Sequence, residues 1–583
     1  MLRVLGAASL AAATAAVGLA APAAGATEEG YTLSVFHHND AESAIIADGD
    51  FGGAARFVNA TWRYRAEAEQ AGNATLMVNA GDSFLASPEW AANPSYWFYD
   101  SIYQQMVNYD VMGIGNHEFD FGPDVFATFI KGFTAGDATP PFVSANLDFS
   151  GVPSLQAYVD QGVLAPSTVV EKDGERIGVI GATTPLLDAI SSPGDVEVGD
   201  VVPAVQAEID ALTADGVEII ILVSHLQSLN NDIEVVSQLS GLDAAIGGGG
   251  DQLQANEGDL LLPDDEADPE FPYPLVVADA DGDEVPVVSG PGEMNYLGEL
   301  VLTFDADGEV TNVGGQPHRV SGIEPELITP HPTVEALVEA PIAEFVAELE
   351  AEVIGSSDVD LNGQREPGIR TQETGLGDLI ADSLLWQANQ LAADAGVGEA
   401  DIALQNGGGI RNDSVIPAGP ITALTTFDIL PFANFVTVVE GVEPETLVEI
   451  LENAYSAVED VDGRFAQIAG FSVVYDPSAQ AREVDEDGNV LTDGERIVSV
   501  TLDDGTAIVA DGEIVDGAPA VNIATIDFLA RGGDQYPFGE DATFSLLATS
   551  YQQALANYIV DGLGGTISAA DYPVDGAGRI TTG

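Results

Sequence analysis

The sequence contains no cysteine and few basic residues. Without cysteine the chain can form no disulfide, no thiolate nucleophile and no Cys-ligated metal site. Its 16 Lys and Arg residues stand against 95 Asp and Glu residues, for a formal net charge of −79 at pH 7. A chain this acidic does not capture nucleic acid or an anionic membrane by broad electrostatic attraction. Any phosphate group that it binds must be held locally, by a few cations in a negative background.

Lysine is especially scarce, since only Lys131 and Lys172 occur and the other basic residues are arginines. Excess carboxylate with little lysine is typical of a surface that stays soluble in salt water, where screening weakens the repulsion between like charges. Hydrophobic residues still make up 46% of the chain, so it can bury large cores. The length of 583 residues predicts two or more domains.

The N-terminal segment carries one charge, Arg3, and then an Ala/Leu/Val-rich run that ends in small residues. This pattern predicts a secretory signal peptide over residues 1–26, cleaved after Ala26, with an uncleaved anchor as the alternative. Later in the chain there is no run of about 18 apolar residues, so we expect no stable membrane span. The mature protein is therefore expected to be secreted, periplasmic or on the exterior of the cell envelope.

Strand-like and amphipathic segments alternate from residue 31 to about residue 250. The predicted strands are 31–36, 75–78, 110–113, 177–180 and 218–223, and helical patterns include 54–68 and 203–214. This alternation predicts a layered α/β domain. We place this first domain at residues 27–330, a Pro-opened linker helix at 331–355, and a second, mixed α/β domain at 356–583. Within the second domain we expect a helix over 375–393 and a strand over 401–404.

Polar segments follow the predicted strands of the first domain. They are Asn39-Asp40-Ala41-Glu42, Gly81-Asp82, Gly115-Asn116-His117-Glu118-Phe119-Asp120, Ser224-His225 and the segment Gly247 to Gln252. Open α/β sheets place their sites beyond the carboxyl ends of the strands, so these side chains should converge. Asp, Asn and His ligands without Cys suit a pair of divalent metal ions bridged by one carboxylate.

In this order the segments resemble the calcineurin-like metallophosphoesterase pattern and, more narrowly, the exported 5′-nucleotidase/UDP-sugar hydrolase family. The resemblance implies a four-layer α/β/β/α N-terminal domain with a mixed α/β C-terminal substrate domain. It also implies that Asp40 binds one metal ion, that Asp82 bridges both, and that Asn116 and His225 bind the second. His117, oriented by Asp120, would act at the phosphate as an acid or as an electrophile.

The sequence departs from the family pattern at two positions. Glu42 stands where the family commonly has His, and Gly249 and Asp251 align with a Gly-His-x-His or Gly-His-x-Gln segment. One imidazole is thus replaced by a carboxylate and another is lost, so that Asp251 or Gln252 must compensate. Glu42 and Asp251 could instead support the ligands through hydrogen bonds. More carboxylate ligands favour Mn²⁺, Mg²⁺ or Ca²⁺ over Zn²⁺, and the identity of the two ions stays open.

Scarce arginines mark the second domain. Arg365 and Arg370 precede the predicted helix, and Arg411 ends the segment Asn406-Gly407-Gly408-Gly409-Ile410-Arg411. A Gly triplet allows close approach of a ligand to the backbone, and Arg binds phosphate or carboxylate with two donors, although a Gly-rich turn alone has a structural explanation. The resemblance extends to this segment, to Leu430-Pro431-Phe432, and to the run from Phe528 to Asp534.

By that resemblance, Phe432 and Phe528 would sandwich a nucleobase and Asp534 would contact the nucleoside. Phosphate or ribose would be held by Arg370, Asn406, Gly408 and Arg411. Phe432 could instead be a core aromatic. Base stacking tolerates base identity, so purine and pyrimidine nucleotides are both expected to fit.

The resemblance therefore predicts an exported, two-domain enzyme with two metal ions. It would hydrolyse nucleoside 5′-monophosphates to nucleoside and phosphate, with a hinge between the domains within residues 329–356. Close alternatives are hydrolysis of nucleotide sugars or of 2′,3′-cyclic nucleotides. A catalytically weak nucleotide-binding surface protein is the alternative from another class. The expected partner is a small-molecule nucleotide and not nucleic acid, and nothing in the sequence argues against a monomer.

Overall fold

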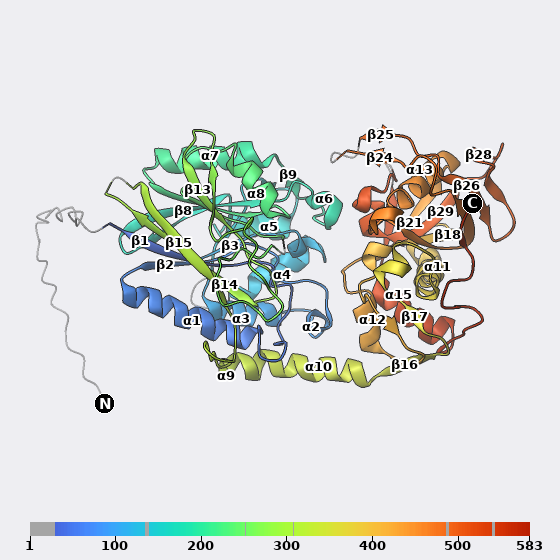
Figure 1. Cartoon of the computed structure of the whole chain (residues 1–583), viewed down its shortest axis with the longest axis horizontal. Helices are drawn as coiled ribbons and strands as arrows, with labels where there is room; N and C mark the ends of the chain where they lie inside the picture. The colour runs from blue at the N-terminus through green and yellow to red at the C-terminus, as the bar shows by residue number, and fades with distance from the viewer. Residues whose placement is uncertain (1–29, 135–138, 251, 307, 486–488, 539–542) are drawn as a thin grey trace, which may run out of the picture.

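The computed structural model describes residues 30–583 except 135–138, 251, 307, 486–488 and 539–542. The predicted signal peptide over residues 1–26, and with it the predicted export, lies outside the described residues, as does Asp251. The chain forms two halves that lie side by side, the first blue to green and the second yellow to red in Figure 1. Among the described residues, none of the helices is long and apolar enough to cross a membrane.

The first half contains two mixed sheets. The first has the order β15-β14-β1-β2-β3-β4-β6, with β1 (Thr32–His38), β2 (Ala74–Asn79), β3 (Val111–Gly113), β4 (Phe142–Val143), β6 (Leu164–Ala165), β14 (Tyr296–Phe304) and β15 (Val310–Arg319). The second has the order β12-β13-β11-β10-β8-β7, with β7 (Ser167–Lys172), β8 (Glu175–Thr183), β10 (Ile219–His225), β11 (Ala244–Ile246), β12 (Leu275–Ala278) and β13 (Glu284–Val288). A short pair, β5 (Leu147–Asp148) and β9 (Glu197–Val198), lies apart from them.

Helices cover the outer face of each sheet. They are α1 (Ala54–Ala71), α2 (Pro88–Ala91), α3 (Tyr99–Val107), α4 (Pro123–Phe133), α5 (Pro153–Val159), α6 (Leu187–Ile190), α7 (Val201–Ala214) and α8 (Leu229–Val236). Three separate hydrophobic clusters fill the spaces between the layers. Strand β10 illustrates how one strand contributes to two clusters, because successive side chains point to opposite faces of a sheet. Ile221 faces the other sheet, and Leu222 packs toward α7 and α8. The layers are therefore α/β/β/α, which confirms the predicted fold class of this half.

The second half is mixed α/β around a single hydrophobic cluster. One five-stranded sheet has the order β22-β18-β29-β21-β30, with β18 (Ile402–Asn406), β21 (Phe435–Val442), β22 (Ala466–Ala469), β29 (Val521–Ile526) and β30 (Phe544–Ser550). Another has the order β28-β27-β26-β23-β32, with β23 (Phe471–Tyr475), β26 (Ile497–Leu502), β27 (Ala507–Ala510), β28 (Glu513–Ile514) and β32 (Ile580–Thr582).

Smaller ladders and several helices complete the described part of this half. The ladders are β20-β16-β31, β17-β19 and β24-β25, with β16 (Val353–Ser357), β17 (Leu361–Asn362), β19 (Val415–Ile416), β20 (Gly419–Thr422), β24 (Glu483–Val484), β25 (Val490–Thr492) and β31 (Thr566–Ile567). The helices are α11 (Gly375–Ala395), α12 (Ala423–Ile429), α13 (Pro444–Ala454), α14 (Asp527–Ala530) and α15 (Tyr551–Asn557). Helix α11 begins where the Thr374 side chain accepts a hydrogen bond from the Gly377 N–H, which caps it.

A helical stretch joins the two halves along one side of the molecule (Figure 1). It consists of α9 (Pro332–Val334), the turn Glu335–Glu339 and α10 (Ala340–Ala351). Val338 and Ile342 belong to the helix-side core of the first half, and the Ala55 N–H donates to Glu339 Oε1 at 2.8 Å. The start of this stretch is thus anchored to the first half. The exact domain boundaries, and the hinge within residues 329–356, stay predictions.

Candidate metal and substrate site

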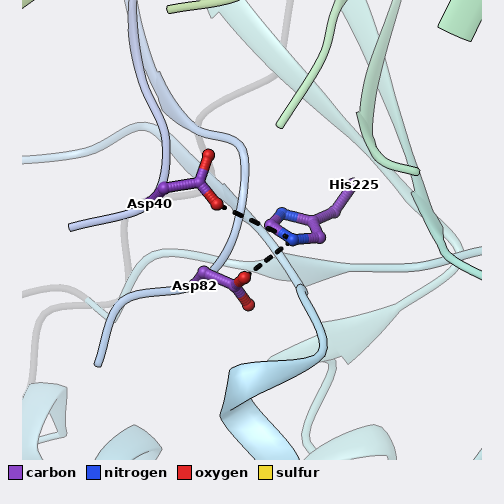
Figure 2. Close-up of side chains that lie close together, drawn as sticks. All are labelled: Asp40, Asp82 and His225. Atoms are coloured by element: carbon purple, nitrogen blue, oxygen red, sulfur yellow. Dashed lines mark ion pairs between the residues drawn. The ribbon is translucent and has the colours of Figure 1, made fainter. Parts of the chain in front are cut away.

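The polar segments converge at one edge of the two sheets of the first half. Strands β1, β2 and β3 pair in parallel, as do β8, β10 and β11, so their carboxyl ends face the same way. Figure 2 shows Asp40, Asp82 and His225 pointing toward one another. His225 Nε2 lies 2.8 Å from Asp82 Oδ2 and 3.8 Å from Asp40 Oδ1. All three side chains are buried.

His225 has the bonding pattern of a metal ligand. Its Nδ1–H donates to the Ala80 carbonyl at 2.8 Å, which fixes the tautomer and directs Nε2 between the two carboxylates. Nε2 is buried, and among the described residues its 2.8 Å ion pair with Asp82 does not have the geometry of a hydrogen bond. Burial lowers the pKa of His225, but the charges of Asp82 and Asp40 outweigh it and raise the pKa to about 10. In the metal-free protein a proton therefore balances the charge that a cation would balance, and the residues fit a divalent ion.

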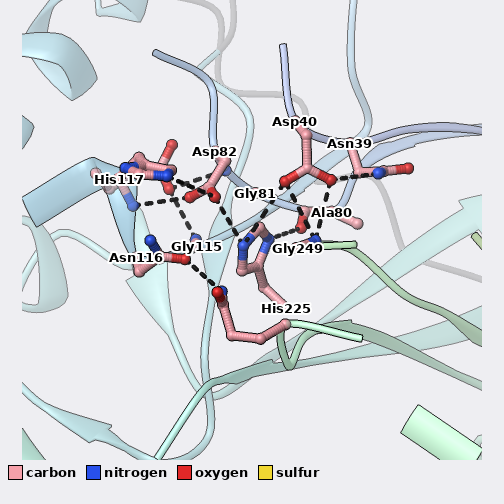
Figure 3. A network of polar contacts seen from close by, with 12 residues as sticks. Asn39, Asp40, Ala80, Gly81, Asp82, Gly115, Asn116, His117, His225 and Gly249 are labelled. Carbon is pink, nitrogen blue, oxygen red and sulfur yellow. Dashed lines mark hydrogen bonds and ion pairs between the residues drawn. The ribbon is translucent and has the colours of Figure 1, made fainter. Parts of the chain in front are cut away.

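Backbone and amide donors hold Asp40 in place (Figure 3). The Gly249 N–H lies 3.0 and 3.2 Å from its two carboxylate oxygens, and the Asn39 side chain donates to Oδ2. Burial raises the pKa of Asp40 to about 6, with His225 acting to lower it and Asp82 to raise it. Gly249 therefore takes part in the site through its backbone, although it supplies no imidazole.

Glu118, whose role the sequence reasoning missed, organises the loops that carry the other candidate ligands. It accepts hydrogen bonds from the backbone N–H groups of Gly115 at 2.7 Å, Ser83 at 2.7 Å and Asp82 at 3.1 Å. Burial raises the pKa of Glu118 to about 7. A buried carboxylate at the centre of three N–H donors fixes two loops together.

Two groups of side chains could each hold a cation, and Asp82 belongs to both. One is Asp40, Asp82 and His225, and the other is Glu42, Asp82 and His117, with ligand atoms within 4.8 Å of one another in each group. A shared carboxylate is what the predicted bridging role of Asp82 requires. The grouping places His225 beside Asp40, whereas the resemblance assigns these two residues to different ions. Asn116 lies between the groups and the cavity, where its Oδ1 accepts from Gln227 Nε2 at 2.5 Å.

His117 and Asp120 form a hydrogen-bonded pair at the cavity wall. His117 Nδ1 donates to Asp120 Oδ2 at 2.7 Å, and the Ser191 hydroxyl donates to the other oxygen of Asp120 at 2.8 Å. His117 Nε2 lies 3.8 Å from Asp82 Oδ2. Burial opposes the charge on His117, but Asp120 and Asp82 raise its pKa well above the ordinary value. In the metal-free protein these charges therefore favour the protonated form of His117, which is more exposed than His225.

A cavity of about 470 Å³ separates this wall from the second half. The first half contributes Asn116, His117, Asp120, Ser191, Ser192 and Gln227 to its lining, and the second contributes Arg370, Asn406, Gly408, Arg411, Phe432, Phe528, Arg531 and Asp534. All the predicted substrate residues thus line one space, opposite the candidate metal ligands. Phe432 and Phe528 are both half-buried, with one part against the core and another at the cavity.

The wall formed by the second half is organised by polar contacts among these residues. Asn406 Nδ2 donates to Asp534 Oδ2 at 2.6 Å, and the guanidinium of Arg411 lies 5.3 Å from the centre of the Phe432 ring. Arg370 Nε is buried without a hydrogen-bond partner among the described residues. A cation with an unsatisfied donor beside a cavity is suited to an anionic ligand.

A direct contact between the two halves was not predicted from the sequence. The Ser192 hydroxyl lies 3.4 Å from Asp527 Oδ2, and Arg531 Nη2 donates to Ser192 Oγ at 3.2 Å. These residues are far apart in the sequence, and a hydroxyl followed by small residues carries no signal of such a contact. All three residues line the cavity.

Comparisons with known proteins agree with this architecture. Residues 353–540 match the family model described as the 5′-nucleotidase C-terminal domain. The crystal structure of a 5′-nucleotidase precursor from Thermus thermophilus superposes with a TM-score of 0.67 and 30% identity, covering 95% of this chain and 99% of that one. The human 5′-nucleotidase is 26% identical over 548 residues, which span 89% of this chain and 86% of that protein.

A longer relative aligns over the same region. The trifunctional nucleotide phosphoesterase protein YfkN of Bacillus subtilis (strain 168) is 28% identical over 543 residues, which span 88% of this chain and only 33% of that protein. The similarity to the Thermus structure covers 95% of this chain and so extends over both halves. The chain is therefore a phosphoesterase-type enzyme that belongs to the 5′-nucleotidase family, with a metallophosphoesterase N-terminal domain and a 5′-nucleotidase C-terminal domain.

Proposed function

We propose that this protein hydrolyses nucleoside 5′-monophosphates to nucleoside and orthophosphate with the help of two divalent cations. The supporting observation is the shared cavity, in which the candidate metal ligands and the His117–Asp120 pair face two Phe rings and two Arg side chains. One wall suits the chemistry of phosphate ester hydrolysis, and the other suits a nucleoside. The Thermus and human relatives are both 5′-nucleotidases by name, which agrees with this substrate class.

Asp40, Asp82 and His225 would hold the first cation, and Glu42, Asp82 and Asn116 would hold the second. Bound cations supply a water of lowered pKa and withdraw charge from the phosphoryl oxygens. Arg370 and Arg411 would balance the phosphate charge from the opposite wall. Phe432 and Phe528 would stack on the base, and Asp534 would accept from the ribose hydroxyls.

His117 would donate a proton to O5′ of the nucleoside as the bond between phosphorus and O5′ breaks. Its Nδ1 is held by Asp120, so Nε2–H is the donor that faces the cavity. His117 lines the cavity and its Nδ1 is held by Asp120, which leaves Nε2 for the leaving group and favours the acid role over a ligand role. His225 is fully buried and cannot reach the leaving group, so the two histidines have separate roles.

A nucleotide sugar is a second candidate substrate, because a further cavity adjoins the first. It has a volume of about 520 Å³ and shares Asp120, Ser192 and Arg531 with the first cavity. A substrate with an additional group beyond the nucleotide could extend into it. Comparing UDP-glucose with UMP as substrates separates a nucleotide-sugar hydrolase from a strict monophosphatase.

The test is phosphate release from AMP by the metal-stripped protein in high salt, reconstituted separately with Mn²⁺, Mg²⁺, Ca²⁺ and Zn²⁺. UMP, UDP-glucose and 2′,3′-cyclic AMP complete the panel, and Asp82→Asn serves as the inactive control. We expect turnover of AMP and UMP, with a harder ion such as Mn²⁺ more effective than Zn²⁺ because of Glu42. Absence of turnover with every metal and substrate would overturn the proposal in favour of a nucleotide-binding protein.

A further inference from the structure

Gln227 has a backbone conformation that its side chain does not favour. Its φ is +72°, in the left-handed region where residues other than Gly, Asn and Asp are strained. The residue lies in the turn between His225, which ends β10, and Ser228, which caps α8. A glycine would adopt this turn without strain. Strain of this kind persists where the surrounding structure holds the residue, and it clusters at functional sites.

The side chain of Gln227 reaches the candidate metal site. Its Nε2 donates to Asn116 Oδ1 at 2.5 Å, and both residues line the cavity beside His117. Figure 3 shows Asn116 next to His117, at the edge of the polar network. The strained turn thus places the amide N–H donor of Gln227 next to Oδ1 of Asn116, which is a candidate ligand.

The same turn occupies the space next to Gly249. A Cβ atom at Gly249 would lie 2.9 Å from Cα and N of Gln227 and 2.8 Å from His225 Nε2. Gly249 itself has a φ of +86°, so a side chain there would be both strained and crowded. The backbone of Gln227 therefore excludes an imidazole at position 249, on the side of the site where the resemblance leads one to expect it.

We propose that Gln227 is a positioning residue that fixes Asn116 as a ligand of the second cation. An amide oxygen has two lone pairs, so Asn116 Oδ1 can accept from Gln227 and still face a cation. The donor prevents the Asn116 amide from rotating its NH₂ group toward the cation. In this way Gln227 compensates for the missing imidazole without becoming a ligand. The inference rests on the metal assignment of the proposed function.

The variant Gln227→Glu distinguishes two effects on cation affinity, the positioning of Asn116 by a hydrogen bond and the attraction of the cation by a nearby negative charge. A carboxylate cannot donate to Asn116 Oδ1, so the Asn116 amide would turn its NH₂ group toward position 227 and its oxygen away. Positioning by hydrogen bond therefore predicts weaker cation binding in this variant. An added negative charge near a cation site, acting by itself, predicts tighter binding.

The experiment titrates Mn²⁺ into metal-stripped, full-length protein by calorimetry and compares Gln227→Glu and Gln227→Gly with the parent chain. We expect the Kd of the weaker Mn²⁺ site to rise by roughly 10- to 100-fold in both variants, as for other residues that orient ligands. Asn108→Gly is the matched control, because Asn108 is an exposed residue with a φ of +62° at the end of α3. It should leave both affinities unchanged.

The melting temperature of the metal-free Gln227→Gly variant should equal or exceed that of the parent chain, because glycine removes the backbone strain. This readout shows that the variant folds, so its Mn²⁺ affinity can be interpreted even if Gln227→Glu is poorly stable. Wild-type affinities in Gln227→Gly, or equal or tighter binding in Gln227→Glu, would overturn the inference. A parent chain that binds two Mn²⁺ ions but does not hydrolyse AMP would reject the proposed function alone.

Discussion

At the scale of single residues, buried carboxylates shape the site before any cation arrives. Glu118 binds three backbone N–H groups, and Asp232 accepts from the Ser224 hydroxyl at 2.7 Å beside the β10 end. Burial raises the pKa of Asp232 to about 7. These groups are not candidate ligands, yet they fix the loop that carries Asp82 and the end of β10 that carries His225. The site is therefore preformed, which reduces the reorganisation that accompanies cation binding.

Asp120→Asn should move the alkaline limb of the kcat–pH profile to lower pH. Asp120 raises the pKa of His117, so removal of its charge lets the imidazolium lose its proton at a lower pH, by about 1–3 pH units for a charge this close. We expect kcat to fall at pH 8 by more than it falls at pH 6. The measurement is kcat for AMP from pH 5 to 10 in saturating Mn²⁺. A uniform loss at all pH values would mean that Asp120 does not act through the proton on His117.

Cation binding should release close to one proton at pH 7.5. The pKa of His225 in the metal-free protein is about 10, so the imidazole is protonated until a cation displaces the proton. At pH values below that pKa, the affinity for Mn²⁺ should therefore increase by roughly tenfold for each unit by which the pH is raised. Calorimetric titration in two buffers of different ionisation enthalpy measures the proton count. His318→Gln, remote from the site, should leave the count unchanged, whereas a buffer-independent enthalpy would contradict the assignment.

At the scale of strands, helices and loops, the parts with strong periodicity were predictable. The apolar run within residues 218–223 predicted β10, but the strand continues to His225, which pairs with Thr183 inside the ladder. Ser224 and His225 are polar, so the pattern indicated an end where the structure has two more buried positions. Strands β4 and β6 have two residues each and show no periodicity at all. Helix α11 ends two residues later than predicted, at a left-handed Gly396.

In the candidate site, too, some features were predictable from the sequence and others were not. Ordered motifs after strands predicted which side chains meet, and the structure brings all the described ones together. The left-handed turns at Asp40 and Gln227 were not predictable, because tertiary packing and not local propensity sets them. The distribution of the ligands between two cations was not predictable either, because distances between ligand atoms depend on the conformation of the loops. Asp251 lies outside the described residues, so its proposed compensating role stays a prediction.

Phe432→Ala should raise the KM for AMP with little change in kcat. The ring lies on the loop before β21 and faces the cavity opposite α14, which carries Phe528. Loss of one stacking face costs roughly 1–3 kcal/mol, equivalent to about a 5- to 150-fold rise in KM. Steady-state kinetics give both parameters. Phe432→Tyr retains a stacking face and should restore the KM, and a kcat loss without a change in KM would show that Phe432 is a core residue only.

At the scale of the whole molecule, charge is distributed unevenly. The chain has a net charge of −79 and only 16 basic residues, yet Arg370, Arg411 and Arg531 all line one cavity. A surface this acidic gives phosphate no general attraction, so an anionic substrate would be recognised at the cavity that these guanidinium groups line. The many Asp and Glu side chains elsewhere repel one another, and the strength of this repulsion depends on the ionic strength of the solvent.

We predict that salt stabilises the protein, mostly below about 1 M, where the Debye length falls from roughly 10 Å to 3 Å. Relief of about 3 kcal/mol of repulsion would raise Tm by roughly 6–12 °C in domains of this size. Thermal unfolding in a series of NaCl concentrations from about 0.1 M to 3 M measures the effect, with sucrose of matched osmolality as the control for preferential exclusion. A Tm that is flat up to about 1 M, or that sucrose raises equally, would contradict the screening explanation.

The division of the cavity between two halves gives the substrate the character of a bivalent ligand. In the proposed reaction, the cations of the first half and Arg370 and Arg411 of the second would bind the phosphate, and the nucleoside would contact the second half only, so the intact ester would gain from both halves through a high effective concentration. Hydrolysis cuts the tether between the fragments. Each product would then keep only part of the contacts of the intact ester, so the reaction itself would lower the affinity of the protein for its products.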